Sequence, residues 1–133
     1  MINIDINIIL LILLVHWFAD FHFQSDEMAR GKATSVGLLT QHVVIYTFTW
    51  MVWAFALFET WKHPLSEIWI KCGIFAGVTF FFHWVTDFFT SKIVKKYFDK
   101  KDYHNGFVVI GFDQILHYKQ LFLTYIWLRD LVV

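Results

Sequence analysis

The sequence is poor in cysteine, proline and charge, and each shortage narrows the class of protein. Cys72 is the one cysteine and Pro64 the one proline among 133 residues. A single cysteine excludes an intrachain disulfide and a metal site built from several thiolates. Charged residues make up only 17% of the chain, and 11 basic residues balance 11 acidic ones. The chain lacks the basic excess typical of nucleic-acid binding proteins, so we expect no nucleic-acid partner.

Apolar and aromatic residues are what the sequence has in abundance. Hydrophobic residues make up 58% of the chain and aromatic residues 21%, and the mean hydropathy is +0.53. Such values are typical of membrane proteins rather than of soluble domains. The length suits one domain, so we expect residues 1–133 to form a single integral-membrane domain surrounded by lipid.

Four long apolar segments predict the fold. Each approaches or exceeds the roughly 20 residues that a helix needs to cross a bilayer. Strict alternation of apolar and polar residues is absent, which favours helices over strands. The prediction is an all-α, four-transmembrane-helix, up-down bundle with helices at about 6–23, 38–58, 66–94 and 107–131. Gly106 and Gly111 leave a second option, in which the last segment enters the membrane as a loop before Phe112.

Basic residues are distributed unequally between the two sides of the predicted helices. The loops after the first and third helices carry Arg30, Lys32, Lys95, Lys96, Lys100 and Lys101, and the other side carries Lys62, Lys71 and Arg129. Because positively charged loops stay in the cytoplasm, we expect both termini outside. The first segment has neither a basic start nor a small-residue cleavage site, so we expect it to be retained as a helix.

Two glycines on the third segment predict a helix contact. Gly73 and Gly77 stand four residues apart, a spacing that lets two helices approach closely. His83 lies about 120° around the helix from Gly77, at about 100° per residue. The glycine face therefore differs from the histidine face, and we expect it to support a homodimer.

Three pairs of an imidazole and a carboxylate interrupt the apolar segments at a spacing of four residues. They are His16/Asp20, His83/Asp87 and Asp113/His117. Residues four apart lie on the same face of a helix, so each pair can offer both side chains to one point. Placing one ionisable group in hydrocarbon costs roughly 2.5–3.5 kcal/mol. A bound cation would offset that cost, whereas a metal-free polar network or proton path is the alternative explanation.

The up-down order brings these pairs to one depth in the membrane. The ends of the first and third segments and the starts of the second and fourth lie at the same side of the membrane. His42 lies near the start of the second segment, so it belongs to that side too. We therefore predict one metal centre toward the cytoplasm. Its candidate ligands are His16, Asp20, His42, His83, Asp87, Asp113 and His117.

The residue types narrow the choice of metal. Imidazole and carboxylate without thiolate suit Zn, Mn, Fe, Co or Ni better than Cu(I) or an iron–sulfur cluster. Four histidines and three aspartates exceed one tetrahedral zinc site, so either two ions bind or some residues orient the ligands. We expect one or two divalent ions, with Zn or Mn/Fe favoured. Polar residues near the same depth would support the ligands or contact substrate: Gln24, Tyr46, Ser91, Lys92 and Gln114.

The strings around these residues resemble a known family. His16-x-x-x-Asp20-Phe21-x-x-Gln24 is followed by His42, by His83-x-x-x-Asp87-x-x-x-Ser91-Lys92 and by Gly111-Phe112-Asp113-Gln114-x-x-His117. The pattern is similar to that of domain-of-unknown-function family 3307, a group of small bacterial and phage membrane proteins. The resemblance implies a helical membrane protein of bacterial or phage origin, and so a place in the bacterial inner membrane. It implies no particular reaction or substrate.

Several functions fit a metal centre inside a membrane. A metal-bound hydroxide is a nucleophile at neutral pH, so the leading interpretation is a metal-dependent hydrolase that acts on an ester, phosphoester or amide at the cytoplasmic leaflet. Lys92 or Lys32 would attract an anionic head group. A metal-ion transporter or sensor is the first alternative, because His-x-x-x-Asp on two helices is similar to the zinc site of cation-diffusion facilitators. Four helices are few for alternating access, so a transporter would need a dimer. Haem ligation by histidines leaves the aspartates unexplained, and an accessory protein with a structural metal is the last hypothesis.

Overall fold

The described part of the chain is built from helices. A computed structural model describes residues 5–58 and 64–131, and over these residues all regular elements are helical, which confirms the all-α prediction. The elements are α1 (Ile6–Trp17), which continues as the π-helical turn η1 (Phe18–His22), α2 (Asp26–Gly31), α3 (Val36–Leu57), α4 (Leu65–Asp99) and α5 (Tyr103–Arg129).

Side chains that precede the helices explain where several of them begin. Asp5, Ser25, Ser35 and Asp102 each accept a hydrogen bond from a backbone N–H in the first turn of the following helix, which satisfies one of the donors that a helix start leaves free. The turn between α4 and α5 is short because Lys101 adopts a positive φ of 59°. That left-handed residue reverses the chain within a few residues.

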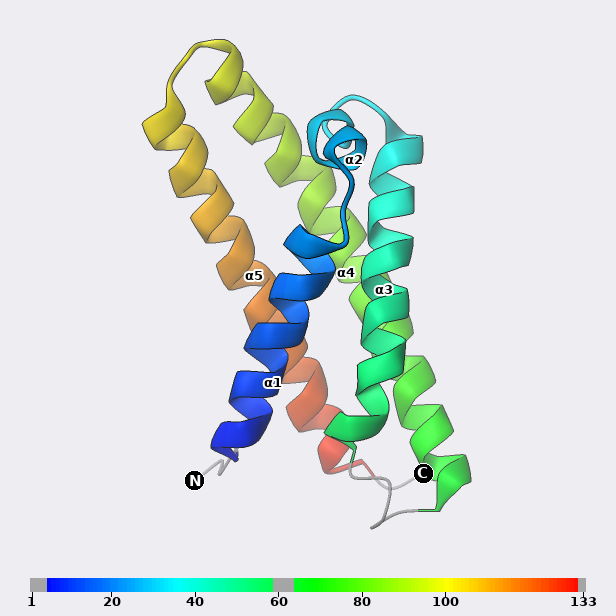
Figure 1. The fold of residues 1–133 in the computed structure, drawn as a ribbon. Helices are drawn as coiled ribbons and strands as arrows, with labels where there is room; N and C mark the ends of the chain where they lie inside the picture. Colours follow the sequence, from blue (N-terminus) through cyan, green and yellow to red (C-terminus); the bar gives the residue numbers. More distant parts are fainter. Residues whose placement is uncertain (1–4, 59–63, 132–133) are drawn as a thin grey trace.

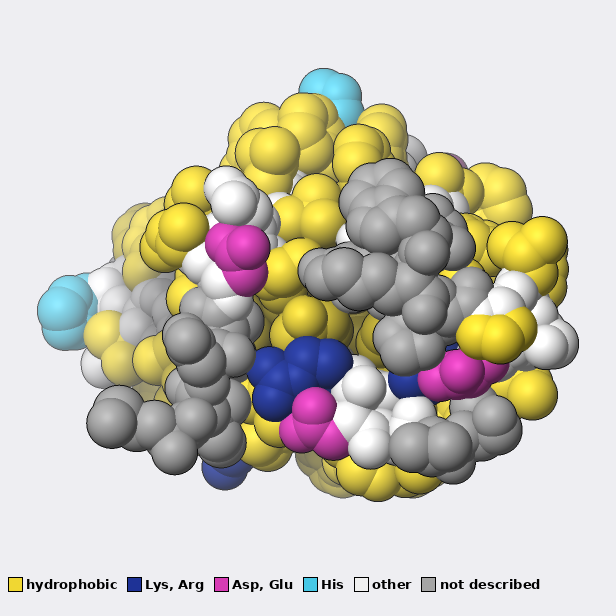
Figure 2. Space-filling view, turned by 90° about the horizontal axis from the view of Figure 1, so that it is seen from below, with side chains coloured by type: hydrophobic (Ala, Val, Ile, Leu, Met, Phe, Trp, Pro, Cys, Tyr) yellow, Lys and Arg dark blue, Asp and Glu magenta, His cyan; other side chains and the backbone are white. Residues whose placement is uncertain are grey.

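The long helices run alternately up and down, and they pack side by side along most of their length (Figure 1). One end contains α2 and the α4–α5 turn, and we call it the α2 end. The other end, called the core end, holds most of the buried apolar side chains. These include Ile12, Trp50, Phe75, Leu121 and Leu128, none of which is exposed to solvent. Figure 2 looks onto the core end, where a few charged groups lie among hydrophobic side chains.

Some predicted boundaries were wrong. The third long helix continues to Asp99 instead of ending near residue 94, and the fourth begins at Tyr103 instead of about 107. Gly106 and Gly111 both lie inside α5, so the alternative of a loop entering the membrane is wrong. A Cβ at Gly106 would collide with the ring of Phe98, so this glycine lets α4 and α5 approach closely beside the turn. The short helix α2 was not predicted.

Two of the helices are long and apolar enough to cross a membrane. They are α3 and α4, whereas Ile6–His22 is an apolar helix of shorter length. Helix α5 is continuous, but its middle contains polar residues, including Asp113, Gln114 and His117. Gly73 and Gly77 are exposed on α4, and a Cβ at either would meet open space. The homodimer through this face stays a prediction.

Candidate metal centre

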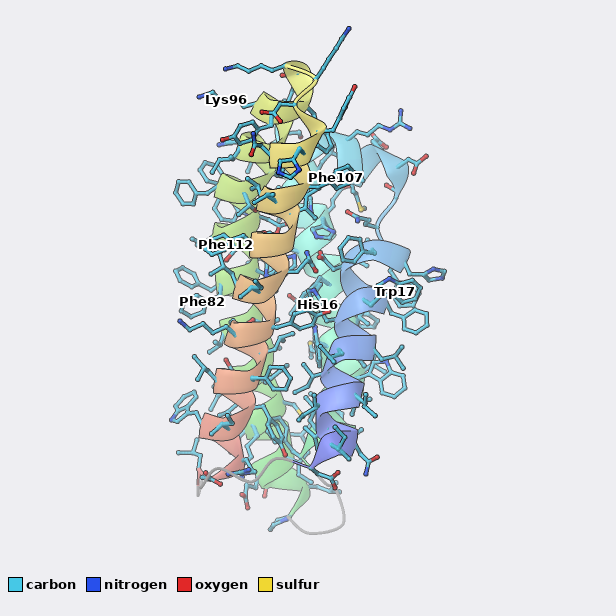
Figure 3. All side chains as sticks on the ribbon, turned by 90° about the vertical axis from the view of Figure 1, so that its left-hand side faces the viewer. His16, Trp17, Phe82, Lys96, Phe107 and Phe112 are labelled. Carbon is cyan, nitrogen blue, oxygen red and sulfur yellow. The ribbon has the colours of Figure 1, made fainter. Side chains whose placement is uncertain are left out.

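The predicted ligands come from four helices and meet inside the protein. His16 lies on α1 and Asp20 in η1, His42 on α3, His83 and Asp87 on α4, and Asp113 and His117 on α5. Each of these residues exposes 8% of its surface or less. Figure 3 shows the contrast on neighbouring residues, because His16 points from α1 between the helices while Trp17 points away from them.

A wide turn positions Asp20. The residues Phe18–His22 form a π-helical turn, closed by a hydrogen bond from the N–H of Phe23 to the carbonyl of Phe18. Such turns are rare and occur frequently at functional sites. Here the turn ends the first long segment and holds the carboxylate of Asp20 against His42, whose Nε2 is 3.1 Å from Oδ1.

Four of the residues form a compact set that we call the first ligand group: Asp20, His42, His83 and Asp87. The Nε2 atom of His42 is 3.1 Å from Nε2 of His83 and 3.3 Å from Oδ2 of Asp87. His83 Nε2 is 3.5 Å from Oδ1 of Asp20 and 3.6 Å from Oδ2 of Asp87. Four ligands about 2.0–2.1 Å from a tetrahedral zinc stand about 3.3 Å apart, so these separations match the edges of such a site.

Hydrogen bonding alone does not explain how the two histidines are turned. Their Nε2 atoms face each other, and one proton at most can lie between them. The Nδ1 atoms of His42 and His83 are buried, and neither has a hydrogen-bond partner among the described residues. Both rings therefore direct Nε2 to one point and leave Nδ1 without a hydrogen bond. This is the arrangement expected if a cation binds between the two Nε2 atoms.

A second ligand group lies beside the first and consists of Asp20, Asp113 and His117. His117 Nε2 is 3.3 Å from Oδ2 of Asp113 and 3.1 Å from Oδ1 of Asp87. Asp87 thus turns one oxygen toward His117 and the other toward His42. The two carboxylate oxygens of Asp20 also have different neighbours, with Oδ1 near His42 and Oδ2 near Gln114. Two carboxylates shared between neighbouring groups are suited to bridging two cations.

His16 contacts supporting residues in this arrangement. Its Nε2 donates to Oε1 of Gln114 at 2.6 Å, and its Nδ1 accepts from the hydroxyl of Tyr46 at 2.7 Å. The amide nitrogen of Gln114 then donates to Asp20 and Asp113, at 3.0 and 3.1 Å. His16 remains 3.8 Å from Asp20. Both ring nitrogens are used, so His16 orients Gln114 against the second ligand group.

Lys32 enters the first ligand group from the loop that follows α2. Its Nζ donates to Oδ2 of Asp87 at 2.7 Å and lies 3.4 Å from Nε2 of His42. Burial by itself lowers the pKa of Lys32, but the negative charges of Asp87 and Asp20 outweigh burial and raise the pKa above its usual value. The ammonium is therefore charged at neutral pH. The charge of Lys32 was the signal available before the structure, because a loop has no periodicity that would predict the direction of the side chain.

A cleft of about 460 Å³ leads from the α2 end to the ligands. Asp20, Asp87 and Asp113 line its floor. Its walls are partly apolar, with Phe21, Val94, Phe98 and Ile110, and its lining also includes Arg30, Lys32, Lys95 and Asp99. The cleft gives the carboxylates of both ligand groups access to molecules from outside.

Two residues predicted to support the site, Gln24 and Ser91, line the cleft. The Oε1 of Gln24 and the Oγ of Ser91 are buried and have no hydrogen-bond partner among the described residues. Thr90 was not predicted, although it lies one turn after Asp87 on α4. Its hydroxyl is 2.6 Å from Oδ1 of Asp113. The spacing of three residues from Asp87 was the available signal.

Lys92 does not reach the cleft. Its Nζ lies 3.2 Å from the centre of the Phe88 ring, and it lines a different groove beside Lys96 and Lys100. Adjacent residues on a helix point about 100° apart. Ser91 and Lys92 therefore cannot both face the ligands, and the structure turns Ser91 toward them.

Residues 8–132 match the family described as "Protein of unknown function (DUF3307)". The match spans most of the chain, which therefore belongs to this family. Among curated proteins and solved structures, none matches the chain.

Proposed function

We propose that this member of the DUF3307 family is an integral membrane, metal-dependent hydrolase. The observation that carries the proposal is the convergence of two groups of buried His and Asp side chains, whose aspartates Asp20, Asp87 and Asp113 line an open cleft. A structural metal needs no cleft, whereas a catalytic one needs a position that substrate or water can reach.

Two divalent ions, Zn or Mn/Fe, fit the ligand set best. The first ligand group supplies two imidazoles and two carboxylates, and the second adds Asp113 and His117. Asp20 and Asp87 would bridge the ions, since each faces both groups. A metal in such a site lowers the pKa of bound water to about 7 and so supplies a hydroxide nucleophile. Gln114 and Thr90 hold the carboxylates in place by hydrogen bonds.

The substrate would be an ester, phosphoester or amide presented at the cytoplasmic leaflet. In this proposal the protein is a four-transmembrane-helix bundle, in which α1 and α5 join the two helices that are long and apolar enough to span. The polar residues in the middle of α5 face the other helices, as the burial of Asp113 and His117 indicates. Basic residues gather at the α2 end, which we place in the cytoplasm of a bacterial cell, with the protein in the inner membrane.

The alternatives fit the geometry less well. A transporter needs a path past its ligands, but Ile12, Trp50, Phe75 and Leu121 pack together on the far side of the site. A haem needs axial nitrogens on opposite faces of a flat macrocycle. The rings of His83 and His117 instead stack with centres 4.1 Å apart, which leaves no space for a porphyrin between them.

Elemental analysis and turnover test the proposal together. The protein purified in mild detergent is analysed for metal and assayed with p-nitrophenyl acetate, p-nitrophenyl phosphate and the amide p-nitroacetanilide. We expect stoichiometric metal and hydrolysis of at least one compound, and loss of both in His83→Ala. The matched control is His22→Ala, because His22 is exposed outside both ligand groups. Circular dichroism shows whether each variant remains helical.

The outcomes separate the parts of the proposal. If the wild-type protein neither carries metal nor takes it up, the metal centre is overturned. If it holds metal and hydrolyses no ester, phosphoester or amide, the hydrolase is overturned and a structural or sensing metal takes its place.

A further inference from the structure

We propose that Lys32 and a metal ion exclude each other from the first ligand group, and that the displaced ammonium then binds an oxyanion of the substrate in the cleft. The inference rests on the proposed function. It makes Lys32 a specificity-determining residue, and it names the substrate class as a molecule whose reacting group carries negatively charged oxygens, such as a phosphoester.

The first argument is that the ammonium stands where a cation would bind. Lys32 Nζ contacts Oδ2 of Asp87 and lies 3.4 Å from Nε2 of His42, and these two atoms both belong to the first ligand group. A metal would take the same two atoms at about 2.0–2.2 Å. Two positive charges cannot share that position in a buried site, where Coulomb repulsion is strong. One must therefore leave when the other enters.

The second argument is that the side chain of Lys32 has somewhere to go. Lys32 follows directly after α2, and it lines the cleft beside Arg30. The side chain is 17% exposed, so it already lies along the route from the floor of the cleft to its mouth. Rotation of side-chain torsions would carry the ammonium into the cleft without disturbing the apolar core.

The backbone that carries Lys32 is held in place. Gly31 packs so closely on Leu38 of α3 that a Cβ would collide with the leucine side chain. Ser25 caps the start of α2, and the hydroxyl of Thr34 donates to the carbonyl of Gly31. The exchange therefore needs movement of one side chain and not of the whole helix.

Charge determines what the cleft attracts before and after the exchange. Without metal, the ammonium of Lys32 is held by Oδ2 of Asp87 and is not available to an anion. Two divalent ions would outweigh the three carboxylates by one positive charge, which the hydroxide of the proposed function would cancel, and the displaced Lys32 then adds a positive charge. The loaded cleft then attracts oxyanions, whereas a neutral ester or amide gains nothing from Lys32.

Variants of Lys32 and Lys92 test the exchange by calorimetry in detergent. Zn²⁺ or Mn²⁺ is titrated into the metal-free protein, and inorganic phosphate is then titrated into the loaded protein. We expect Lys32→Met to bind metal at least about tenfold more tightly, because no buried ion pair has to be broken. We expect the same variant to bind phosphate at least about tenfold more weakly. Lys92→Met should change neither, since Lys92 lies outside the cleft.

The opposite signs of the two effects distinguish this role from a structural one, which would weaken both. Equal metal affinity in the wild type and Lys32→Met overturns the inference and leaves the proposed metal site standing. Absence of metal binding in both proteins overturns the inference and the proposed function together. Unchanged phosphate affinity in the loaded variant overturns the assignment of Lys32 to the oxyanion.

Acetylation of the wild-type protein gives a second measurement that needs no folded variant. Lys32 and Lys92 are modified with an amine-reactive acetyl donor, and their rates are followed by mass spectrometry. We expect metal to raise the rate at Lys32 several-fold, and phosphate to lower it again, while the rate at Lys92 stays constant. A rate at Lys32 that does not rise with metal overturns the exchange.

Discussion

The two ends of the helix packing use the same helices for opposite purposes. At the core end, Trp50, Phe75 and Leu121 are fully buried among other apolar side chains. Toward the α2 end, the same helices bury Asp20, Asp87 and His117, and Nε2 of His117 lies 3.1 Å from Oδ1 of Asp87. Packing at the core end stabilises the fold, and it holds the same helices in place so that their ligand residues stay close together.

The difference explains why the cleft lies where it does. Apolar side chains stabilise a helix contact by close packing, and the core end has that contact. The carboxylates repel one another, so the helices that carry them gain little from closing further. In the structure the α4–α5 turn lies apart from α2 at this end (Figure 1), and the cleft lies beside Phe21 and Ile110.

Replacing the carboxylates of the ligand groups should have the largest effect on metal binding, because these groups lie toward the α2 end and supply the negative charge that a cation needs. Asp20→Asn should abolish binding of both metal ions, because Asp20 belongs to both ligand groups. Asp113→Asn should lose only the ion of the second group. Metal-to-protein ratios from elemental analysis check this. Equal ratios in the two variants would contradict the assignment of Asp20 as a bridge.

A cavity at the core end should separate stability from metal binding. Phe75→Ala removes a fully buried ring and should lower the free energy of unfolding by about 3–5 kcal/mol. The affinity of the folded protein for metal should stay within about threefold, because Phe75 belongs to neither ligand group and stands eight residues before His83 on α4. Thermal unfolding and metal titration below the transition check both parts. A parallel loss of affinity would show that the two ends are not independent.

A change that loosens the support of the site should have a smaller effect. Tyr46→Phe removes the hydroxyl that holds His16, and through it Gln114. Loss of such a supporting hydrogen bond typically lowers metal affinity by about 10–100-fold, and we expect the lower part of that range because the ligands themselves remain. Tyr103→Phe, at an exposed position on α5, is the control. Metal titration of the two variants decides whether the hydroxyl of Tyr46 matters.

Periodicity made the helices and their inward faces predictable. The spacing of four residues in His83/Asp87 and Asp113/His117 places each pair on one face, and the up-down order brings the faces together. The structure joins these residues through contacts of 3.1–3.6 Å. Local pattern was sufficient here because a regular helix converts sequence distance directly into direction.

Irregular backbone was not predictable in the same way. The turn that contains Asp20 is wider than an α-helical turn, and nothing in its residues marks it. Lys32 reaches the ligands because α2 packs on the start of α3, where Gly31 contacts Leu38. That contact follows no periodic pattern in the sequence. Lys92 was predicted near the site from its charge and its position along the chain, whereas its side chain lies over the ring of Phe88.

The π-helical turn of residues 18–22 has a consequence for how this protein can vary. A regular helix through the same residues would have stronger hydrogen bonds and would gain local stability. It would also rotate the carboxylate at position 20 out of line with its partners. Substitutions that make this stretch a more stable regular helix would therefore turn the carboxylate of Asp20 away from its partners. One added or deleted residue in the turn would be enough to change its direction.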